Sequence, residues 1–599
     1  MIHISIISSS IERTWPSEGK VVFLGEWCCI YSRVNEWREI DYEIAEYHWN
    51  DREKLRNDYQ IIKRYYEFYL QVLADKLNEI HGTNHSIRYW RILIGWWLFY
   101  FIGVLFDRWQ IIKNAESKYP NAIVVCLSNE NVIQPAQNMH EFITLVTEDD
   151  FWNEGVFSLI FKNFSTLVIK EVKVENSVKE LAYKTTVTTQ INSMLVGKLK
   201  YLVKFLVKLP VHGLSTTKFF YGNGISIESS YLSRLNLIKL FLMNRELPYS
   251  LNFKPFGRFI TSTKMRDWSL PSMSGSEFDQ VLNFFIPKFL PNIYLEGYQQ
   301  LKIRADQKIS KKKFKTIVTA DAYSANDSWK AWAAKNVEMG SKLVVMQHGG
   351  LYGVNTFSAT EDHEIAISDT FLSWGWSRED SNKVTPSPAN KLIHLKNKGK
   401  FQNNGPAILI AGALPQQSYH ISSIPIGPQF LNYFNDQFRF VNALSPEIKS
   451  RLQIKLFPSD FGWNQQLRWK NFDPTIQILS GNKPLMQHLQ KAKLSISTYN
   501  ATTFLETFVM GIPTVMFWDD SYWELNNFAL PYYNKLLDAK ILFYNPEKCA
   551  EHINQIWNNP LLWWKNAKTE EAVEEFLEKF ANVPKKSITI LSKLINLDH

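Results

Sequence analysis

The chain has 599 residues, and its 45% hydrophobic and 21% charged content is typical of a globular protein with large cores. A net charge of +9 spread over 67 basic and 58 acidic side chains suits anionic ligands or a membrane surface and does not require nucleic acid. The four cysteines form no Cys-x-x-Cys pair, which argues against a disulfide framework and a cysteine zinc site. Because the N-terminus also lacks a signal-peptide pattern, we expect a cytoplasmic protein.

The first part of the chain predicts strands and a helical block. A helical, charged pattern runs from about residue 41 to residue 115. Its apolar run, residues 92–106, is short for a membrane span and flanked by charges, so we expect a buried helix. The segments that favour strands are 2–8, 21–24, 122–127 and 142–146.

Two further features of this part bear on function. The strand at 21–24 runs into Gly25, Glu26 and Trp27, and α/β proteins place ligands at such strand ends. Residues 196–209 carry lysines at four-residue spacing opposite apolar side chains. That pattern predicts a basic amphipathic helix, which either lies on an anionic membrane or presents a solvated face.

A strand–helix–strand unit follows at 316–346, and it predicts a parallel sheet. Its first strand ends at Asp321 and its second at the sequence Gln347-His-Gly-Gly. His348 is the side chain most easily tuned as an acid or base near neutral pH, and Gly349 and Gly350 allow a ligand to approach the backbone. Asp321 could act as a general base or orient the histidine, although an N-cap is the simpler interpretation.

A polar linker at about 385–404 precedes a second α/β pattern, with strands expected at 407–411, 454–457 and 475–479. The segment 494–518 then predicts a buried strand, a polar turn, a helix and another strand. A helix N-terminus has unpaired amides and a positive dipole end, so this turn predicts a phosphate site unless it is an ordinary cap. The polar residues involved are Ser497, Thr498, Asn500, Thr502 and Thr503, with Glu506 one turn later to reach sugar hydroxyls.

The segment 458–463 also follows a strand and could shape a nucleotide pocket. Pro458 fixes the backbone, Gly462 permits a turn, and Asp460 offers a hydrogen-bond acceptor. Trp463 offers a stacking face, although core packing explains it equally well. The chain has neither a Gly-x-Gly-x-x-Gly motif after a strand nor a Walker A lysine, which disfavours dinucleotide oxidoreductases and P-loop ATPases.

In this order, the motifs resemble a bacterial family of surface-carbohydrate transferases of about this length. More distantly, they resemble the capsular ulosonic-acid (Kdo and nonulosonic acid) transferases of GT-B architecture. The resemblance spans nearly the whole chain. It rests on residues 24–28, 347–353, 458–463, 497–506, 511–513 and 517–519.

The resemblance implies an α/β fold with two Rossmann-like lobes facing across a cleft. Residues 1–390 would form the acceptor-side lobe, with the helical insertion at about 41–115, and residues 391–599 the donor-binding lobe. Related enzymes use CMP-activated donors, and some hold the cytidylate with a His-Pro pair. Phe457 and Pro458 occupy that position here, which moves phosphate binding toward Thr502 and Thr503.

We therefore expect a glycosyltransferase that moves a sugar, a nonulosonic or ulosonic acid from a CMP-linked donor, to a surface glycan at the inner face of the membrane. Asp321 and His348 would be catalytic, Gln347, Gly349 and Gly350 would join the donor site, and no metal or other cofactor is expected. The partners would be the nucleotide sugar, a glycan or lipid-linked acceptor and an anionic membrane, but not nucleic acid. Two alternatives remain: a CDP-polyol phosphotransferase of the same fold, and a noncatalytic glycan-assembly protein.

Overall fold

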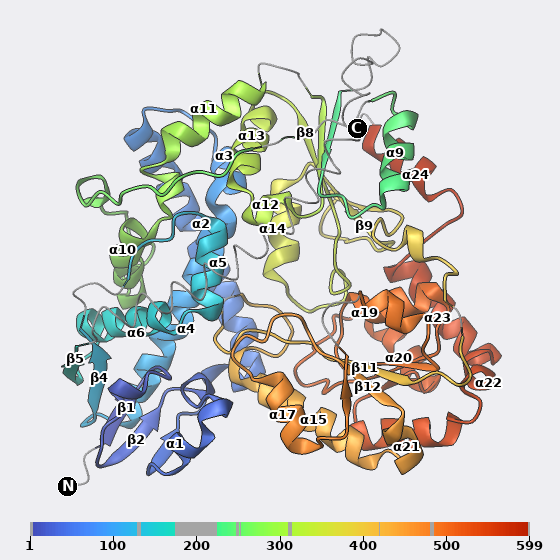
Figure 1. The fold of residues 1–599 in the computed structure, drawn as a ribbon. Helices are drawn as coiled ribbons and strands as arrows, with labels where there is room; N and C mark the ends of the chain where they lie inside the picture. Colours follow the sequence, from blue (N-terminus) through green and yellow to red (C-terminus); the bar gives the residue numbers. More distant parts are fainter. Residues whose placement is uncertain are drawn as a thin grey trace.

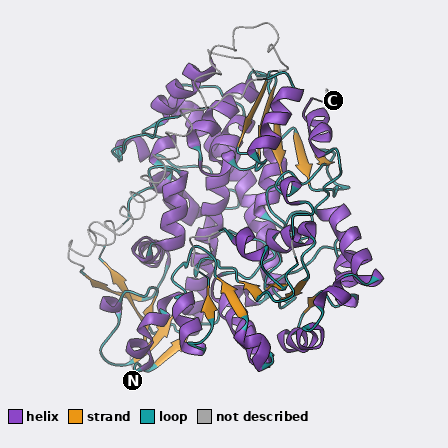
Figure 2. Cartoon of the chain, turned by 45° about the vertical axis from the view of Figure 1, so that its right-hand side comes forward, coloured by secondary structure: helices purple, strands orange, loops and turns teal. Residues whose placement is uncertain are grey.

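The computed structural model describes residues 4–128, 133–173, 224–246, 251, 253–309, 314–399, 401–418, 420–479 and 484–596. Within these residues the strands form three sheets, at the lower left, upper right and lower right of Figure 1. Figure 2 shows helices gathered between the groups of strands. The α/β class with parallel sheets that was expected from the sequence is confirmed, and residues 1–390 contain two of these sheets.

The first sheet is parallel and has the order β3-β2-β1-β4-β5. The strand order reverses between β1 and β4, which is the arrangement of a Rossmann-like sheet with a topological switch point. The turn at Gly25 lies just beyond β2. The strands are β1 (Ile4–Ile7), β2 (Lys20–Phe23), β3 (Tyr42–Ile44), β4 (Ile123–Leu127) and β5 (Val168–Val172).

The second sheet runs β10-β9-β8-β7-β6 in one direction, and all its pairs are parallel. Parallel strands end at the same edge, so the residues after β6, β7 and β8 are neighbours there. The strands are β6 (Ile225–Glu228), β7 (Thr316–Thr319), β8 (Lys342–Met346), β9 (Thr370–Ser373) and β10 (Val384–Pro386).

The third sheet is also parallel and has the order β13-β12-β11-β14-β15-β16, with its switch point between β11 and β14. Every residue of β11, β14 and β15 is buried, because helices cover both faces of such a sheet. The strands are β11 (Ala407–Ile410), β12 (Leu452–Lys455), β13 (Gln477–Ile478), β14 (Leu494–Ser497), β15 (Thr514–Phe517) and β16 (Leu542–Phe543).

The helical block lies between the first and second sheets (Figure 1). It contains α2 (Arg52–His81), α3 (Ile87–Trp90), a π-helical turn (Arg91–Gly95) and α4 (Trp96–Lys118). The continuous helix Ile87–Lys118 is the one described helix long and apolar enough to cross a membrane, and 94% of its apolar window is buried inside the protein. The prediction of a buried helix at 92–106 is confirmed.

The expected strand at 142–146 is wrong, because these residues lie in α5 (Met139–Glu148). The side chain of Asn138 caps this helix by accepting a hydrogen bond from the Glu141 amide at 2.9 Å. The short apolar run Phe-Ile-Thr-Leu-Val is compatible with either structure, and the cap together with packing of Phe142 and Val146 into the core selects the helix.

The remaining helices mostly cover the sheets. The last, α24, returns from the third-sheet part of the chain to pack on β7 and α9 of the second sheet (Figure 1). These remaining α-helices are α1 (Val34–Arg38), α6 (Asp150–Phe164), α9 (Arg234–Met243), α10 (Glu277–Phe289), α11 (Tyr298–Ile309), α12 (Ala322–Ala325), α13 (Asp327–Glu338), α14 (Ala359–Ile367), α15 (Phe430–Ala443), α16 (Pro446–Ser450), α17 (Gln465–Phe472), α18 (Leu485–Leu489), α19 (Thr502–Met510), α20 (Leu530–Asp538), α21 (Pro546–Ile556), α22 (Pro560–Trp564), α23 (Ala567–Phe580) and α24 (Ser587–Asn596).

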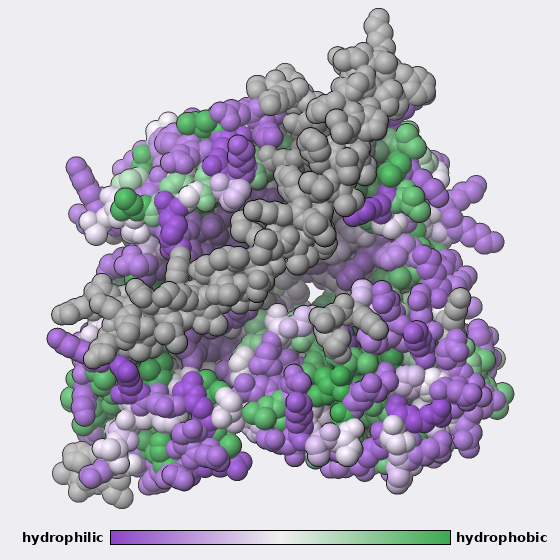
Figure 3. Space-filling view, in the orientation of Figure 1, coloured by the Kyte–Doolittle hydropathy of each residue, from purple (hydrophilic) through white to green (hydrophobic). Residues whose placement is uncertain are grey.

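The surface seen in Figure 3 is largely hydrophilic, with hydrophobic side chains gathered in a few places, one of them over α9 at the upper right. The basic segment 196–209 lies outside the described residues.

Candidate functional site

Asp321 follows β7 and is held by two hydroxyl groups from the turn after β6. Its carboxylate accepts a hydrogen bond from Tyr231 at 2.6 Å and another from Ser229. Both Ser229 and Tyr231 have positive φ angles, 55° and 56°, which are uncommon outside glycine and mark local strain. Asp321 stands before α12, yet its side chain accepts no capping hydrogen bond from that helix, and the Ser324 amide donates to the Asp321 backbone carbonyl instead. The N-cap interpretation therefore does not account for Asp321.

His348 follows β8 and packs against the same tyrosine. The imidazole stacks on Tyr231 with 6.0 Å between ring centroids and 12° between planes. Its Nδ1 lies 3.2 Å from the hydroxyl of Tyr352, which donates at 2.6 Å to Glu364. Burial lowers the pKa of His348 to about 4, with Lys391 acting in the same direction and Asp321 opposing. The imidazole is therefore neutral at pH 7.

Glu364 lies beneath His348 and is fully buried. It accepts hydrogen bonds from Tyr352 and Tyr323, and it is 3.5 Å from His348 Nδ1. Burial raises the pKa of Glu364 well above its usual value, while the two tyrosine hydroxyls act in the opposite direction. This network fixes the ring of Tyr352 and, through it, the position of the histidine.

The loop after β8 contacts the N-terminus of α19 directly. The Gly350 amide donates to Thr502 Oγ1 at 3.0 Å. A Cβ added at Gly350 would lie 2.8 Å from the carbonyl carbon and oxygen of Ala501, so this approach requires glycine. Ala501 is the N-cap of α19 and provides no side-chain acceptor, which leaves the first amides of the helix without a side-chain cap.

Glu506 and Lys391 complete this cluster. Lys391 Nζ lies 3.6 Å from Glu506 Oε1 and 5.6 Å from the ring centroid of Tyr231. Burial raises the pKa of Glu506, and Lys391 opposes that shift. We call this cluster the junction site, because it joins the edges of the second and third sheets. It consists of Tyr231, Asp321, His348, Gly350, Lys391, Thr502 and Glu506.

Several residues that were expected to contact the sugar-nucleotide donor instead form hydrogen bonds within the loops. Gln347 is 1% exposed, and its side chain bonds Gly349, Trp374 and Trp376, so it shapes the loop from inside. The turn after β14 is similar. There Ser497 donates to the Tyr499 carbonyl, Thr498 donates to the Ile410 carbonyl, Thr503 pairs with the Tyr499 hydroxyl, and Asn500 accepts from Tyr533.

Asn500 retains one unused group. It is fully buried, and its Nδ2 has no hydrogen-bond partner in the described part of the chain. Gly349 lies beside Thr502, since an added Cβ would be 3.9 Å from the Thr502 hydroxyl. The backbone of the turn and the side chain of Thr502 are thus the groups here that remain able to meet a ligand, whereas the Asn500 amide is an unsatisfied donor inside the protein.

The segment 458–463 forms a different contact. Trp463 is 1% exposed, donates to the Leu414 carbonyl at 2.6 Å and packs on Phe430, so it offers no stacking face to a base. This corrects the expectation that Trp463 stacks on a nucleotide base, because its indole packs in the core instead. Asp460 accepts from the amides of Asn464 and Gln465 at the start of α17. Gly462 has φ +82°, and Pro458 is exposed.

The expected acceptor residues lie beside this segment rather than beside Asp321. Glu26 interacts with Arg468 of α17, which opposes the rise of the Glu26 pKa caused by burial. The Ser32 amide donates to Asn464 at 3.0 Å across the same contact. Trp27 is 2% exposed and donates to the Ser8 carbonyl, so it belongs to the core. An added Cβ at Gly25 would collide with this indole, which explains the glycine.

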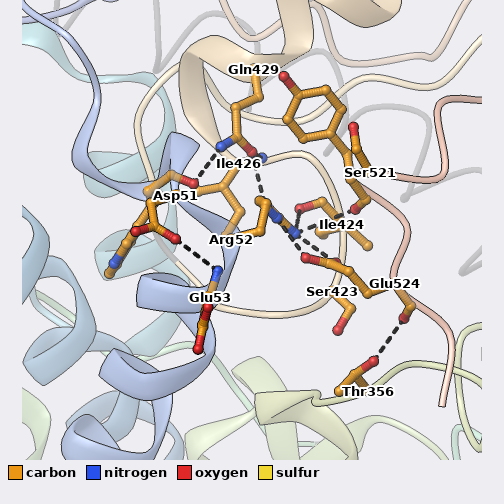
Figure 4. A network of polar contacts seen from close by, with 12 residues as sticks. Asp51, Arg52, Glu53, Thr356, Ser423, Ile424, Ile426, Gln429, Ser521 and Glu524 are labelled. Atoms are coloured by element: carbon orange, nitrogen blue, oxygen red, sulfur yellow. Dashed lines mark hydrogen bonds and ion pairs between the residues drawn. The ribbon is translucent and has the colours of Figure 1, made fainter. Parts of the chain in front are cut away.

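A buried arginine fixes the loops that lead to the junction site (Figure 4). Arg52, the first residue of α2, binds both carboxylate oxygens of Glu524 at 2.6 and 2.8 Å and donates to Gln429 at 2.8 Å. The Glu524 carbonyl accepts from the Thr356 amide at 3.1 Å, and Asn355 forms a β-bridge with Leu525. The loop that continues from His348 is therefore tied to the third-sheet part of the chain and to the helical block.

Sequence reasoning missed Tyr231, Lys391, Tyr352 and Glu364. Their contacts join positions far apart in the chain, such as Tyr231 with Asp321 and Lys391 with Glu506. The one local signal was the strand-like pattern at 225–228, which would have placed Tyr231 at the same edge as Asp321.

A comparison with solved structures finds partial overlaps at low identity. MurG from Acinetobacter baumannii is 12% identical, with 50% of this chain and 80% of that chain covered and a TM-score of 0.30. The UDP-GlcNAc 2-epimerase from Neisseria meningitidis bound to UDP-GlcNAc is 11% identical, with 59% and 90% covered and a TM-score of 0.29. The lipopolysaccharide glycosyltransferase WaaG is 9% identical, with 50% and 96% covered and a TM-score of 0.26.

A comparison with curated proteins finds no match. A family profile described as LIC12162 family transferase matches residues 4–595, which is nearly the whole chain. The chain therefore belongs to the LIC12162 family of transferases.

Proposed function

We propose that this transferase is a glycosyltransferase that moves a nonulosonic or ulosonic acid from a CMP-linked donor to a surface glycan. The acceptor is a glycan or lipid-linked glycan at the cytoplasmic face of the membrane. One observation carries the proposal. Tyr231 holds Asp321 and stacks on the neutral His348. The contact between Gly350 and Thr502 joins this cluster to the N-terminus of α19, which has no side-chain cap. A base and an anion-binding element are thus placed together.

The positive charge for the departing nucleotide phosphate comes from the chain itself. The first amides of α19 and the hydroxyl of Thr502 are suited to phosphate oxygens, and the helix dipole favours their negative charge. Lys391 adds a cation beside Glu506. We infer that these groups stabilise the charge of the leaving group, so that the reaction needs no divalent metal.

Asp321 is the proposed general base on the acceptor hydroxyl. Its hydrogen bonds from Tyr231 and Ser229 hold the carboxylate in position. Because the pKa of His348 is about 4, the imidazole acts as a hydrogen-bonding group and not as a counter-ion. Its placement next to Asp321 suits it to orient the acceptor or the donor carboxylate.

The test is incubation of the purified protein with CMP-, UDP- and GDP-sugars, each with a glycan acceptor, followed by measurement of released nucleotide. We expect CMP release coupled to sugar transfer. Release from UDP-sugars alone would overturn the donor assignment. Phosphorus in the product would indicate a polyol-phosphate transfer, and glycan synthesis that survives loss of the Asp321 carboxylate would indicate a noncatalytic role.

A further inference from the structure

A basic groove lies on the second sheet, next to the segments that build the junction site. It has a volume of about 530 Å³ and runs between α9 and the segment 583–589 that leads into α24. Among the described residues, four lysines line it and no aspartate or glutamate does. The lysines are Lys239, Lys396, Lys585 and Lys586.

The helix that forms one wall of the groove is apolar on both faces. Leu240 and Phe241 face the core at 0% and 3% exposure, where they pack with α24. On the other side, Leu235, Ile238 and Leu242 are 74%, 48% and 59% exposed. Their spacing of three and four residues makes one stripe along α9. Figure 3 shows hydrophobic surface over α9, at the upper right.

Two of the segments that line the groove lie close in the chain to residues of the junction site. Tyr231, which holds Asp321, is three residues before the start of α9. Lys391 is two residues before Ile393, which lines the groove. A ligand held on this surface therefore contacts two chain segments that also carry residues of the junction site.

We propose that this groove and the exposed stripe of α9 bind the surface of an anionic phospholipid bilayer. The exposed leucines and isoleucine would enter the boundary between headgroups and acyl chains, while the lysines would meet the lipid phosphates. The charge also argues against a symmetric pairing of two copies through this face, because four lysines would then oppose four lysines. The inference deepens the acceptor side of the proposed function, since membrane binding here orients the junction site toward a lipid-linked acceptor.

Vesicle co-sedimentation of the full chain tests the proposal without any sugar nucleotide, so its outcome is independent of the donor assignment. We expect binding to phosphatidylcholine vesicles that contain phosphatidylglycerol, weak binding to phosphatidylcholine alone, and loss of binding in high salt. Lys585→Gln with Lys586→Gln should weaken binding roughly 25-fold, since each lysine near an anionic surface contributes roughly fivefold. Leu235→Ser with Leu242→Ser should weaken it as well.

The matched control is Lys470→Gln with Lys491→Gln, two exposed lysines outside the groove. This variant should bind vesicles like the wild type. The proposal is overturned if the wild type does not bind anionic vesicles, or if the control variant loses as much binding as the groove variant. It is also overturned if the leucine variant only converts a dimer to a monomer in light scattering, because the stripe would then be a contact between copies. Unchanged circular dichroism would show that each variant is folded.

Discussion

Replacing Gly350 with alanine tests the contact that joins the second and third sheets. The added Cβ would lie 2.8 Å from the carbonyl carbon and oxygen of Ala501 and 2.9 Å from the Thr502 amide nitrogen, all backbone atoms that cannot rotate away. The loop after β8 must therefore withdraw from α19, and the 3.0 Å hydrogen bond to Thr502 lengthens or breaks. Overpacking of this kind costs about 1–3 kcal/mol, and the lost hydrogen bond about 1 kcal/mol more.

The functional cost follows from geometry. A displacement of about 1 Å between catalytic groups lowers rates about 100-fold, so Gly350→Ala should reduce kcat/KM for nucleotide release by about that factor. Release of nucleotide from a CMP-linked donor measures it, and a thermal melt measures the loss of stability. Gly257→Ala is the control, because a Cβ there meets nothing within 4 Å and its φ is not positive. Wild-type activity and melting temperature in Gly350→Ala would refute the reasoning.

Five further outcomes follow from the site and the loops around it. Asp321→Asn should lower kcat/KM about 10²–10⁴-fold with little change in melting temperature, as expected for a general base. The pKa of His348 is about 4 in the folded protein and near 6.5 in the unfolded chain. The free energy of unfolding that comes from the neutral imidazole is therefore complete above about pH 6.5 and is lost as the pH falls toward 4. His348→Gln should accordingly show a shallower loss of unfolding free energy across that acid range. Arg52→Ala leaves Glu524, which is 14% exposed, without its cation. It should lower the free energy of unfolding by about 3–5 kcal/mol, and a lower melting temperature would show it. Lys391→Met should raise the donor KM roughly 10- to 100-fold, whereas EDTA should leave wild-type activity unchanged.

The corresponding contrary results are distinct. Full activity of Asp321→Asn would exclude Asp321 as the base. Identical acid profiles for wild type and His348→Gln would contradict the lowered pKa of the partly buried imidazole. An unchanged melt for Arg52→Ala would mean that the contact with Glu524 contributes little. Inhibition by EDTA that added Mg²⁺ reverses would contradict the proposed metal independence.

Much of the secondary structure was predictable because its signals are local. The strand β11 is an unbroken apolar run, β8 is apolar after Lys342, and β14 alternates apolar residues with serine. The run at 92–106 is buried as expected. The strand predicted at 142–146 was wrong because a five-residue run with four apolar side chains suits either a strand or a helix, and the cap at Asn138 and the packing of Phe142 decided it. Trp463 illustrates the same limit for a site, since an aromatic ring after a strand can face a ligand or the core.

The sequence by itself determined the parallel α/β class, the buried helix and the polar residues at several strand ends. Hydrophobic periodicity and the residue types that follow a strand both depend on a few neighbouring positions in the sequence. Only the tertiary structure decided which strand ends meet. It brought Gly350, in the loop after His348, to Thr502, placed Glu26 beside Arg468, and added Tyr231 and Lys391 to the junction site. These pairings depend on the order of strands in each sheet and on how the sheets pack, which are set by contacts across hundreds of residues.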